Sequence, residues 1–478
     1  MTAVTSKTDV PNKVTHLTLE QRRALGKEAR ARMPRSSLEG WTPAADRADP
    51  IALLEAQNET READLVPVRH GRMAVSPFTF YRGAAKIMSA DLRTIPRAGL
   101  EVQLCGDAHL SNFGVYASPE RTLLFDLNDF DETLPGPFEY DVARLSASFV
   151  IAGRNNGFTP ADARAAATTP VAAYRKAMQE FAGMRTLDIW YSRLDAEAVL
   201  ATTTAAANKA ERKAAARAER GLAKARTKDS LQALAKLTEI VDGHHRIASD
   251  PPVLIPSREL TQTVGIDPEQ VREAVHGLLQ AYRRTLSDDR RRLLERFQFV
   301  DFARKVVGVG SVGTRAWIAL LEGRDGEDPL FLQIKEATSS VLEDHLPKSR
   351  FRQPGERVVR GQRMMQAASD IFLGWTKGLE ADRYYYWRQL RDMKGSAMIE
   401  RLDPSTMGWY AQVCGWTLAR AHARSGDPVA IAAYLGSGDR FDRAMTDFAD
   451  RYADQNERDY EAFAGAIEAG RLDAVEGV

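Results

Sequence analysis

The segment at 298–337 most restricts how this chain can fold, because its apolar pattern is that of strands within a mainly helical sequence. It reads "QFVDFARKVVGVGSVGTRAWIALLEGRDGEDPLFLQIKEA", with alternating apolar and polar residues, many β-branched side chains and a turn sequence at "GRDGEDP". Alternation with a period of two indicates half-buried strands and not a helix. We therefore predict a group of strands joined by short turns at this point.

Helical patterns dominate on both sides of this segment. Residues 139–245 are rich in alanine with a helical period, and the stretch from "GERVVRGQRMMQAASDIFLGW" to the end is mainly helical. Short strands are predicted in "LEVQLC", "NFGVYA" and "TLLFDL", and a strand pair is predicted around "RYYYWRQLRDM". Helices and strands in separate runs predict the α+β class.

Composition limits the class of protein. A length of 478 residues predicts more than one lobe, and the formal charge of +1 argues against a globally basic nucleic-acid binder. The two cysteines, Cys105 and Cys414, provide neither a disulfide framework nor the spacing of a zinc site. No stretch approaches the roughly 20 apolar residues that span a bilayer. We therefore expect a cytoplasmic protein without a membrane segment.

A basic stripe keeps nucleic acid open as a partner. Its members recur at steps of three and four residues, the spacing of one helix face: Lys209, Lys213, Arg217, Arg220, Lys224 and Lys228. The stripe could bind RNA or an anionic substrate. The alternative is a solvated helix face, in a chain whose total charge is nearly zero.

A glycine pattern lies inside the predicted strands. Gly308, Gly310 and Gly313 form G-x-G-x-x-G, with Ser311 between them. Such glycines let backbone N–H groups approach phosphates, although a plain strand turn gives the same pattern. A dinucleotide-binding fold requires a helix next, whereas "TRAWIALLEG" alternates like a strand and suits the glycine-rich hairpin of kinases. Lys335 ends the next strand, where a kinase lysine holds the α and β phosphates, and a solvated lysine is the alternative.

A second group of polar residues begins near position 105. "CGDAHLSNFG" places Asn112 five residues after Asp107, the spacing of the kinase catalytic loop. "GDAHLSN" closely resembles the G-D-x-H-x-x-N loop of aminoglycoside and choline kinases in the protein-kinase-like superfamily. The resemblance implies that Asp107 orients or deprotonates an acceptor hydroxyl, that Asn112 binds Mg²⁺ and that His109 faces the transferred phosphate. Cys105 departs from the pattern, since these kinases usually carry a histidine before the glycine.

The acidic run "NDFDE" resembles the metal-binding segment of the same enzymes. Asp129 is the preferred Mg²⁺ ligand because it lies 12 residues before Asp141. Asp126, which lies 14 residues after Asn112, is the alternative, and Asp131 is a further candidate. "EYDVARL" resembles the helix that follows, in which Asp141 would brace the catalytic loop. A solvated acidic turn is the other interpretation of this run.

The order of these motifs is the reverse of the kinase order, in which the glycines and the lysine come first. Either the resemblance is accidental or the chain is circularly permuted, and the sequence after Lys335 favours permutation. It offers a helix with Glu356 near its start as the lysine's partner, and a strand and hinge at "YYYWRQLRDMKGS". "YAQVCGWTLARAHARSGD" resembles the helix that leads into the catalytic loop.

We therefore expect a two-lobed, protein-kinase-like fold with a permuted chain order. Its expected parts are a flexible arm at 1–45, a mostly helical catalytic-loop lobe at 46–295, a nucleotide-binding lobe at 296–395 and helices at 396–478 that complete the large lobe.

The implied activity is transfer of the γ-phosphate from Mg²⁺-ATP to a hydroxyl of a small molecule. Kinase-like AMP transfer and catalytically silent nucleotide binding are the alternatives. "SPFTFYRGAA", "GDAHLSNFG" and "NDFDE" together also resemble an uncharacterised bacterial domain-of-unknown-function family. Arg82, in the first of these motifs, either touches phosphate or forms a structural ion pair.

Overall fold

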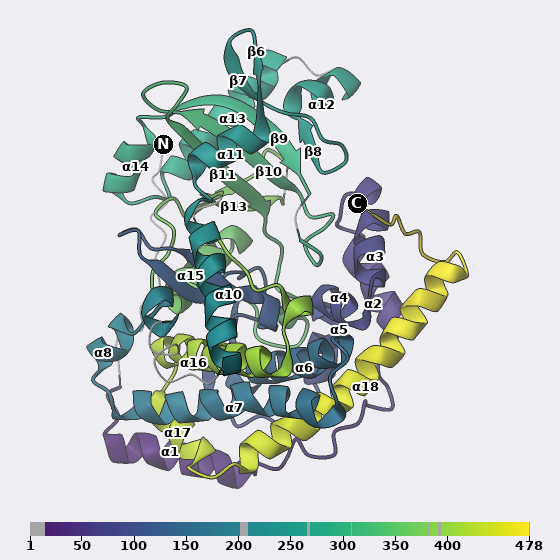
Figure 1. The fold of residues 1–478 in the computed structure, drawn as a ribbon, viewed down its shortest axis with the longest axis vertical. Helices are drawn as coiled ribbons and strands as arrows, with labels where there is room; N and C mark the ends of the chain where they lie inside the picture. The colour runs from purple at the N-terminus through teal and green to yellow at the C-terminus, as the bar shows by residue number, and fades with distance from the viewer. Residues whose placement is uncertain are drawn as a thin grey trace.

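The larger sheet and the long helices occupy separate halves of the molecule (Figure 1). The computed structural model describes residues 15–200, 209–264, 268–306, 308–380, 382–390 and 393–477. The upper half in this view contains the sheet with α11 (Ser230–Leu237) and α13 (Pro268–Arg283). The lower half contains α6 (Phe138–Asn155), α7 (Pro160–Gly183) and α16 (Pro404–Ser425). The predicted α+β class is confirmed.

A six-stranded antiparallel sheet forms the upper half, in the order β12–β13–β11–β10–β9–β8. Its strands are β8 (Leu254–Pro256), β9 (Gln298–Lys305), β10 (Ala316–Glu322), β11 (Pro329–Glu336), β12 (Gly374–Lys377) and β13 (Tyr384–Gln389). The predicted strand segment therefore forms three adjacent strands, and the glycine pattern lies in the turn between β9 and β10.

The two faces of this sheet are covered by different helices, because successive side chains on β11 point to opposite faces. Leu332 and Ile334 pack in one cluster with Tyr282 of α13. Phe331 packs in another cluster with Leu234 of α11. Lys335 shares the face of Phe331, so the end of this face nearest the lower half carries a charged side chain.

The predicted lobe boundary at residue 295 is wrong. The elements between residues 230 and 294 belong to the six-stranded sheet, contact it or pack on elements that contact it, and hydrophobic clusters join several of them to the sheet. They comprise α11, α13, β6 (Thr238–Val241), β7 (His244–Ile247), β8, α12 (Ser257–Val264) and α14 (Asp288–Leu294). Apolar faces on α11 and α13 need a partner surface, and the sheet provides one. The upper half therefore begins near residue 229.

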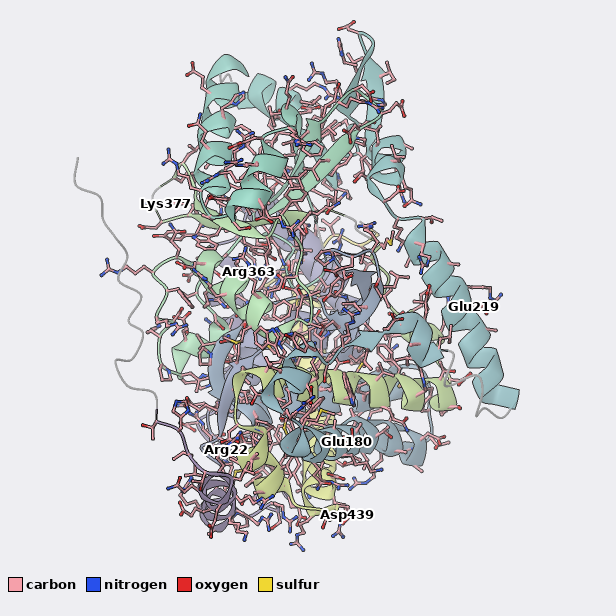
Figure 2. The ribbon with its side chains drawn as sticks, turned by 90° about the vertical axis from the view of Figure 1, so that its left-hand side faces the viewer. Arg22, Glu180, Glu219, Arg363, Lys377 and Asp439 are labelled. Atoms are coloured by element: carbon pink, nitrogen blue, oxygen red, sulfur yellow. The ribbon has the colours of Figure 1, made fainter. Side chains whose placement is uncertain are left out.

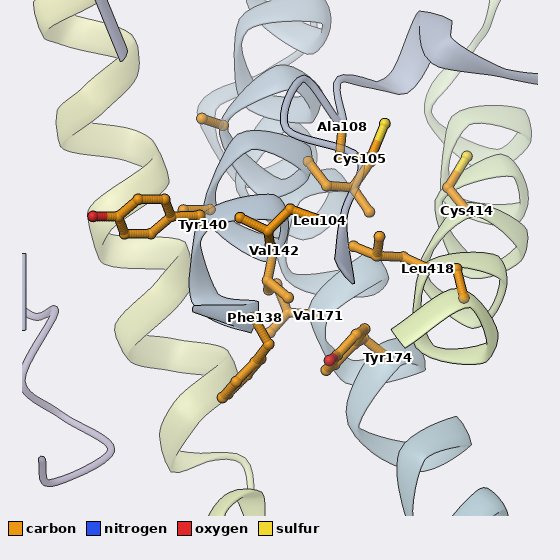
Figure 3. Packing of buried hydrophobic residues seen from close by; sticks show 14 of the residues in the cluster. Leu104, Cys105, Ala108, Phe138, Tyr140, Val142, Val171, Tyr174, Cys414 and Leu418 are labelled. Carbon is orange, nitrogen blue, oxygen red and sulfur yellow. The ribbon is translucent and has the colours of Figure 1, made fainter. Parts of the chain in front are cut away.

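A single large core holds the lower half together. Figure 3 shows Phe138 and Val142 of α6, Val171 of α7 and Leu418 of α16 converging around Leu104. All of these side chains are buried, and burying each contributes roughly 1.5–3 kcal/mol relative to exposure. Other helices on this side are α8 (Thr186–Tyr191), α17 (Pro428–Leu435) and α18 (Arg440–Glu468). This core fixes β1 (Glu101–Leu104), the strand that precedes the Asp107 loop.

The prediction of a flexible arm is wrong for residues 15–45, and residues 1–14 lie outside the described ranges. Helix α1 (Leu19–Arg32) begins at Thr18 with a capping box and packs on α17. A Cβ atom on Gly26 would lie 2.1 Å from the carbonyl oxygen of Ala430, so the two backbones are in direct contact. Arg22, labelled in Figure 2, adds an ion pair to Asp427 at 2.8 Å.

Short N-terminal helices fill the space between the sheet and the long helices. They are α2 (Pro50–Asn58), α3 (Val66–Ala74), α4 (Pro77–Gly83) and α5 (Ala85–Leu92). Ile51, Leu54 and Phe80 form a small core with Phe463 of α18, and Val309 of the glycine turn packs against it. These helices therefore tie the glycine turn to the lower half.

Two more helices connect the halves. Helix α10 (Lys209–Arg226) carries the basic stripe except for Lys228, which follows it, and the helix ends beside Gly395. Helix α15 (Pro354–Met365) packs on β12 and β13. Arg220 and Lys224 are exposed, whereas the side chains of Lys209, Lys213 and Arg217 lie outside the described part of the structure. Within the described ranges, no helix combines the length and the apolar character needed to cross a bilayer.

Candidate functional site

Two loops that connect neighbouring strand pairs form the floor of a central cleft. Strand β1 pairs with β4 (Leu134–Pro137), and β2 (Phe113–Ala117) pairs with β3 (Leu123–Leu127). The chain passes from β1 to β2 through residues 105–112 and from β3 to β4 through residues 128–133. Both connections therefore lie at the same end of the paired strands, which brings the Asp107 loop next to the acidic run.

The central cleft has a volume of about 440 Å³ and contains most of the predicted site residues. Eight of them line it: Asp107, His109, Asn112, Asp129, Asp131, Gly308, Gly310 and Ser311. Lys335 lies directly behind two of these carboxylates. Residues from three distant parts of the sequence thus meet in one cavity.

Asp107 is held by an arginine on α6. The Nε atom of Arg144 donates to Asp107 Oδ1 at 2.8 Å, and Arg144 also stacks over the Tyr81 ring at 3.8 Å. Burial raises the pKa of Asp107, although the Arg144 charge opposes that shift. Arg144 was not predicted from the sequence, yet it lies three residues after Asp141 and so shares its helix face.

His109 is buried beside Asp107, with 3.7 Å between its Nε2 atom and Asp107 Oδ2. Burial and the nearby charges of Arg144 and Arg82 hold the pKa of His109 well below its usual value. The ring is therefore neutral near pH 7. Its Nδ1 atom is buried without a hydrogen-bond partner among the described residues.

Asp141 braces the loop as the sequence predicts. Its carboxylate accepts hydrogen bonds from the backbone N–H groups of Cys105 at 2.7 Å and Gly106 at 2.9 Å. His422 of α16 also contacts Asp141, at 3.1 Å. Gly106 has φ of +86°, and a Cβ atom there would lie 2.2 Å from the carbonyl oxygen of Glu132. Glycine is needed at this position because it tolerates both constraints.

Asn112 closes the same loop. Its side-chain Nδ2 atom donates to the backbone carbonyl of Asp107 at 2.7 Å. Its backbone carbonyl accepts a hydrogen bond from Asn128 N at 2.9 Å. The first bond uses the amide nitrogen, so the Oδ1 atom remains available as an oxygen ligand. The second bond joins the Asp107 loop to the start of the acidic run.

Lys335 pairs with two carboxylates of the acidic run. Its Nζ atom forms an ion pair with Asp131 and lies 3.6 Å from Asp129 Oδ2. Burial alone would lower the pKa of Lys335, but Asp129 and Asp131 raise it above its usual value. Burial would likewise raise the pKa of Asp129, but the charges of Lys335 and Arg388 lower it. Tyr386 of β13 donates to Asp131 at 2.8 Å.

Asp126 lies outside the central cleft. It forms a buried ion pair with Arg420 of α16, and it accepts hydrogen bonds from the backbone N–H groups of Leu127 and Ala367, each at 2.9 Å. Both side chains of the pair are 1% exposed. The structure therefore does not bring this candidate metal ligand into the central cleft.

The glycine turn faces the cleft and is tied down on its outer side. Gly313 accepts a hydrogen bond from Glu62 N at 2.8 Å, and Val312 accepts one from Arg61. A Cβ atom on Gly310 would lie 3.0 Å from the carbonyl oxygen of Arg82. Ser311 Oγ lies 3.5 Å from Asp131 Oδ2, the outer limit of a hydrogen bond.

Glu356 is not brought to Lys335. It pairs with Arg360 one turn along α15, at 3.3 Å. The next residue, Arg357, faces inward and donates to the backbone carbonyls of Asp131 at 2.7 Å and Thr133. One residue corresponds to about 100° of helix rotation, which accounts for the different directions of Glu356 and Arg357.

Glu132 borders the cleft and was not predicted from the sequence. Its Oε2 atom accepts from Val341 N at 2.7 Å, and burial raises its pKa to about 7. No cluster of three or more His, Cys, Asp or Glu side chains suited to a metal occurs in the described ranges. A magnesium ion held with nucleotide phosphates needs only one or two carboxylates from the protein. The Asp129 carboxylate meets this requirement, and the side-chain oxygen of Asn112 would be a further ligand.

The chain belongs to a bacterial protein family described as "Uncharacterized protein conserved in bacteria (DUF2252)", whose profile matches residues 61–466. The match includes the Asp107 loop, the acidic run, the glycine turn and Lys335. The sequence resemblance to a bacterial domain-of-unknown-function family is thereby confirmed. Neither the curated proteins nor the solved structures contain a match to this chain. The protein-kinase-like class stays a prediction.

Proposed function

We propose that this protein is a Mg²⁺-ATP-dependent phosphotransferase that acts on a hydroxyl group of a small molecule. One observation carries the proposal: Lys335 lies 3.6 Å from Asp129, although about 200 residues separate them in the sequence. The kinase resemblance requires that these two groups share one cleft with the glycine turn and Asp107. A chance match of motifs requires no such meeting.

The order of elements around Lys335 supports a permuted kinase-like fold. The glycine turn joins β9 to β10, Lys335 lies on the next strand, and a helix follows before β12 and β13. In kinases the glycine-rich loop, the lysine strand and the adjacent helix come in this order. The far end of α16 then meets β1, where Gln103 N donates to Ser425 Oγ at 3.0 Å. The kinase order would resume at that contact, directly before the Asp107 loop.

Each proposed role uses a contact described above. Asp107, fixed by Arg144, would accept a hydrogen bond from the acceptor hydroxyl and orient it. Asn112 and Asp129 would hold Mg²⁺, and Lys335 would hold the nucleotide phosphates beneath the glycine turn. When bound, Mg²⁺ neutralises charge that develops on the phosphates.

A second candidate retains the nucleotide site without γ-phosphate transfer. Two observations favour it: Lys335 is already paired with two carboxylates, and Glu356 does not contact it. Arg388 also donates to Gln333 at 2.8 Å, on the sheet face that carries Lys335. AMP transfer or silent nucleotide binding would tolerate these departures from an active kinase.

ATP labelled at the α or the γ phosphate separates these functions. The protein with Mg²⁺ and a panel of hydroxyl compounds should transfer only the γ label. Asp107→Asn should reduce transfer by about 10²–10⁴-fold while Mg²⁺-ATP still raises the melting temperature. Asp439→Asn, an exposed and distant change of the same chemistry, serves as the matched control. Transfer of the α label supports AMP transfer, and no rise in melting temperature contradicts a nucleotide site.

A further inference from the structure

Two arginines in the central cleft have charge that the protein does not fully pair. Arg61 and Arg82 both line it, and the Nε atom of each is buried without a hydrogen-bond partner among the described residues. Burial lowers the pKa of Arg61 to about 10 and that of Arg82 below its usual value. Placing a cation where water cannot fully solvate it is unfavourable unless an anion joins it.

Most acidic residues of the cleft contact other cations, and Glu132 accepts a hydrogen bond from a backbone N–H group. Asp107 pairs with Arg144, Asp131 with Lys335, and Glu336 with Arg383 at 2.8 Å. Asp344 pairs with Lys86 at 3.3 Å, and its side chain is 58% exposed, so this contact is weak. The Arg82 guanidinium forms no ion pair with any described residue, and it lies 6.0 Å from the centre of the Phe78 ring. Arg82 thus does not form the structural ion pair that was one of its two interpretations from the sequence.

Arg82 is held between the glycine turn and the Asp107 loop. Its carbonyl oxygen lies against Gly310, and the preceding carbonyl, that of Tyr81, accepts a hydrogen bond from Arg144 at 2.8 Å. Arg144 is the residue that fixes Asp107. Helix α4, which carries Arg82, begins with a capping box at Ser76. The backbone at Arg82 is therefore fixed near Asp107, the residue proposed to orient the acceptor hydroxyl.

We infer that Arg82, assisted by Lys86, forms an anion subsite that selects an acceptor bearing a phosphate or carboxylate group. A guanidinium presents two parallel N–H donors that match either oxyanion, and Lys86, which lines the same cleft, adds a second cation. Arg61 is separate from this subsite, because it donates to the backbone carbonyl of Val312 in the glycine turn. The claim that the bound anion is an acceptor rests on the proposed phosphotransferase function; the anion subsite itself does not.

Binding is tested with three compounds that differ in one group: glycerol, glycerate and glycerol 3-phosphate. Calorimetry on the full chain at fixed ionic strength, without nucleotide, should detect one or both anions and no binding of glycerol. Arg82→Gln should weaken anion binding by about tenfold or more, and Arg82→Lys should weaken it less. Arg185→Gln removes an arginine that is 87% exposed directly before α8, and it should leave anion binding unchanged. Lys86→Gln provides a second test if Arg82→Gln does not fold.

The results also separate the subsite from the enzyme. Equal binding of glycerol and the anions, or unchanged binding in Arg82→Gln and Lys86→Gln, overturns the inference. Displacement of glycerol 3-phosphate by Mg²⁺-ATP in simple competition also overturns it, because Arg82 would then serve the nucleotide. Anion binding that needs Arg82 but is never followed by γ-phosphate transfer supports the subsite and contradicts the phosphotransferase. Comparing glycerate with glycerol 3-phosphate identifies which oxyanion is preferred.

Discussion

The carboxylates of two carboxylate–cation clusters lie within six consecutive residues of the sequence, yet the clusters differ in access to the cleft. Asp126 pairs with Arg420, and both side chains are 1% exposed. Asp129 and Asp131 pair with Lys335, and their side chains are 32% and 27% exposed. The first is a closed cluster in the core, and the second is an open cluster at the central cleft.

The difference shows that charge pairing alone does not identify a functional site. In the closed cluster, backbone N–H groups occupy the remaining carboxylate positions, so no ligand can enter. In the open cluster, the carboxylates keep atoms facing the cavity, and a metal or phosphate could exchange with existing contacts. We infer that the closed cluster stabilises the fold and that the open cluster is the one available to bind a metal or a phosphate.

The largest expected effect is on stability, from opening the closed cluster. Arg420→Met leaves Asp126 buried without its cation, which should cost about 3–5 kcal/mol in the free energy of unfolding. Chemical denaturation measures this loss. Adding Asp126→Asn should recover part of it, because the uncompensated charge is removed.

Arg443→Met is the control for this change, since Arg443 pairs with Asp439 at 3.4 Å on the surface. Exposed pairs contribute about 0–1 kcal/mol, so its effect should be much smaller. Equal losses for Arg420→Met and Arg443→Met would contradict the distinction between a closed and an exposed cluster.

Acid titration gives a second contrast between core and cleft. Glu139 is fully buried, and burial raises its pKa from 4.5 to about 7. A raised folded pKa favours the protonated form, so its contribution to stability is complete below pH 4.5 and is lost as pH rises through 7. Glu139→Gln should remove this loss. Its free energy of unfolding should exceed that of the wild type by about 3 kcal/mol at pH 8 and nearly equal it at pH 4.5.

The matched change at the cleft is Glu132→Gln. Its pKa is also raised to about 7 by burial, but the side chain is partly open to solvent. The gain at pH 8 should therefore be smaller than for Glu139→Gln. Unfolding curves at several pH values measure both variants. A gain in stability that grows as pH falls would contradict the raised pKa of these two carboxyl groups.

Local patterns predicted the parts of the site that depend on neighbours in sequence. The Asp107–Asn112 spacing and the strands that carry the glycine turn and Lys335 follow from motif spacing or periodicity, and the Asp141 brace was implied by the kinase resemblance. Each needs only a short segment to adopt its preferred conformation. The family resemblance rested on the same short motifs.

Long-range pairing explains what the sequence did not predict. Nothing near Asp126 indicates that Arg420, almost 300 residues later, will neutralise it. The apolar face of α11 shows that it needs a partner but not that the sheet is that partner, and the lobe boundary was misplaced for this reason. Glu356 and Arg357 are adjacent, and only packing decides which of them faces inward.

Metal-dependent nucleotide binding should depend on the open cluster and not on the closed one. Asp129→Asn should weaken Mg²⁺-ATP binding by about 10–100-fold, because a proposed metal ligand loses its charge. Asp126→Asn should leave the affinity of the folded protein unchanged and lower only its stability. Calorimetric titration with and without Mg²⁺ distinguishes the two. If Asp126→Asn weakened Mg²⁺-ATP binding and Asp129→Asn did not, Asp126 would be the metal ligand and Asp129 would not.

The smallest effect is expected at Glu356. Its pair with Arg360 at 3.3 Å lies on a helix surface where Arg360 is 47% exposed, and such pairs contribute about 0.3–0.5 kcal/mol. Glu356→Gln should therefore change stability by no more than that and leave Mg²⁺-ATP affinity within about twofold, a change of about 0.4 kcal/mol. Lys335 already has Asp131 and Asp129 as partners, so it does not depend on Glu356 for its position. A tenfold loss of affinity would instead mean that Glu356 turns toward Lys335 when nucleotide binds, which requires rotation of α15 and release of the Arg357 contacts. Proteolysis of α15 with and without Mg²⁺-ATP would then detect that rotation.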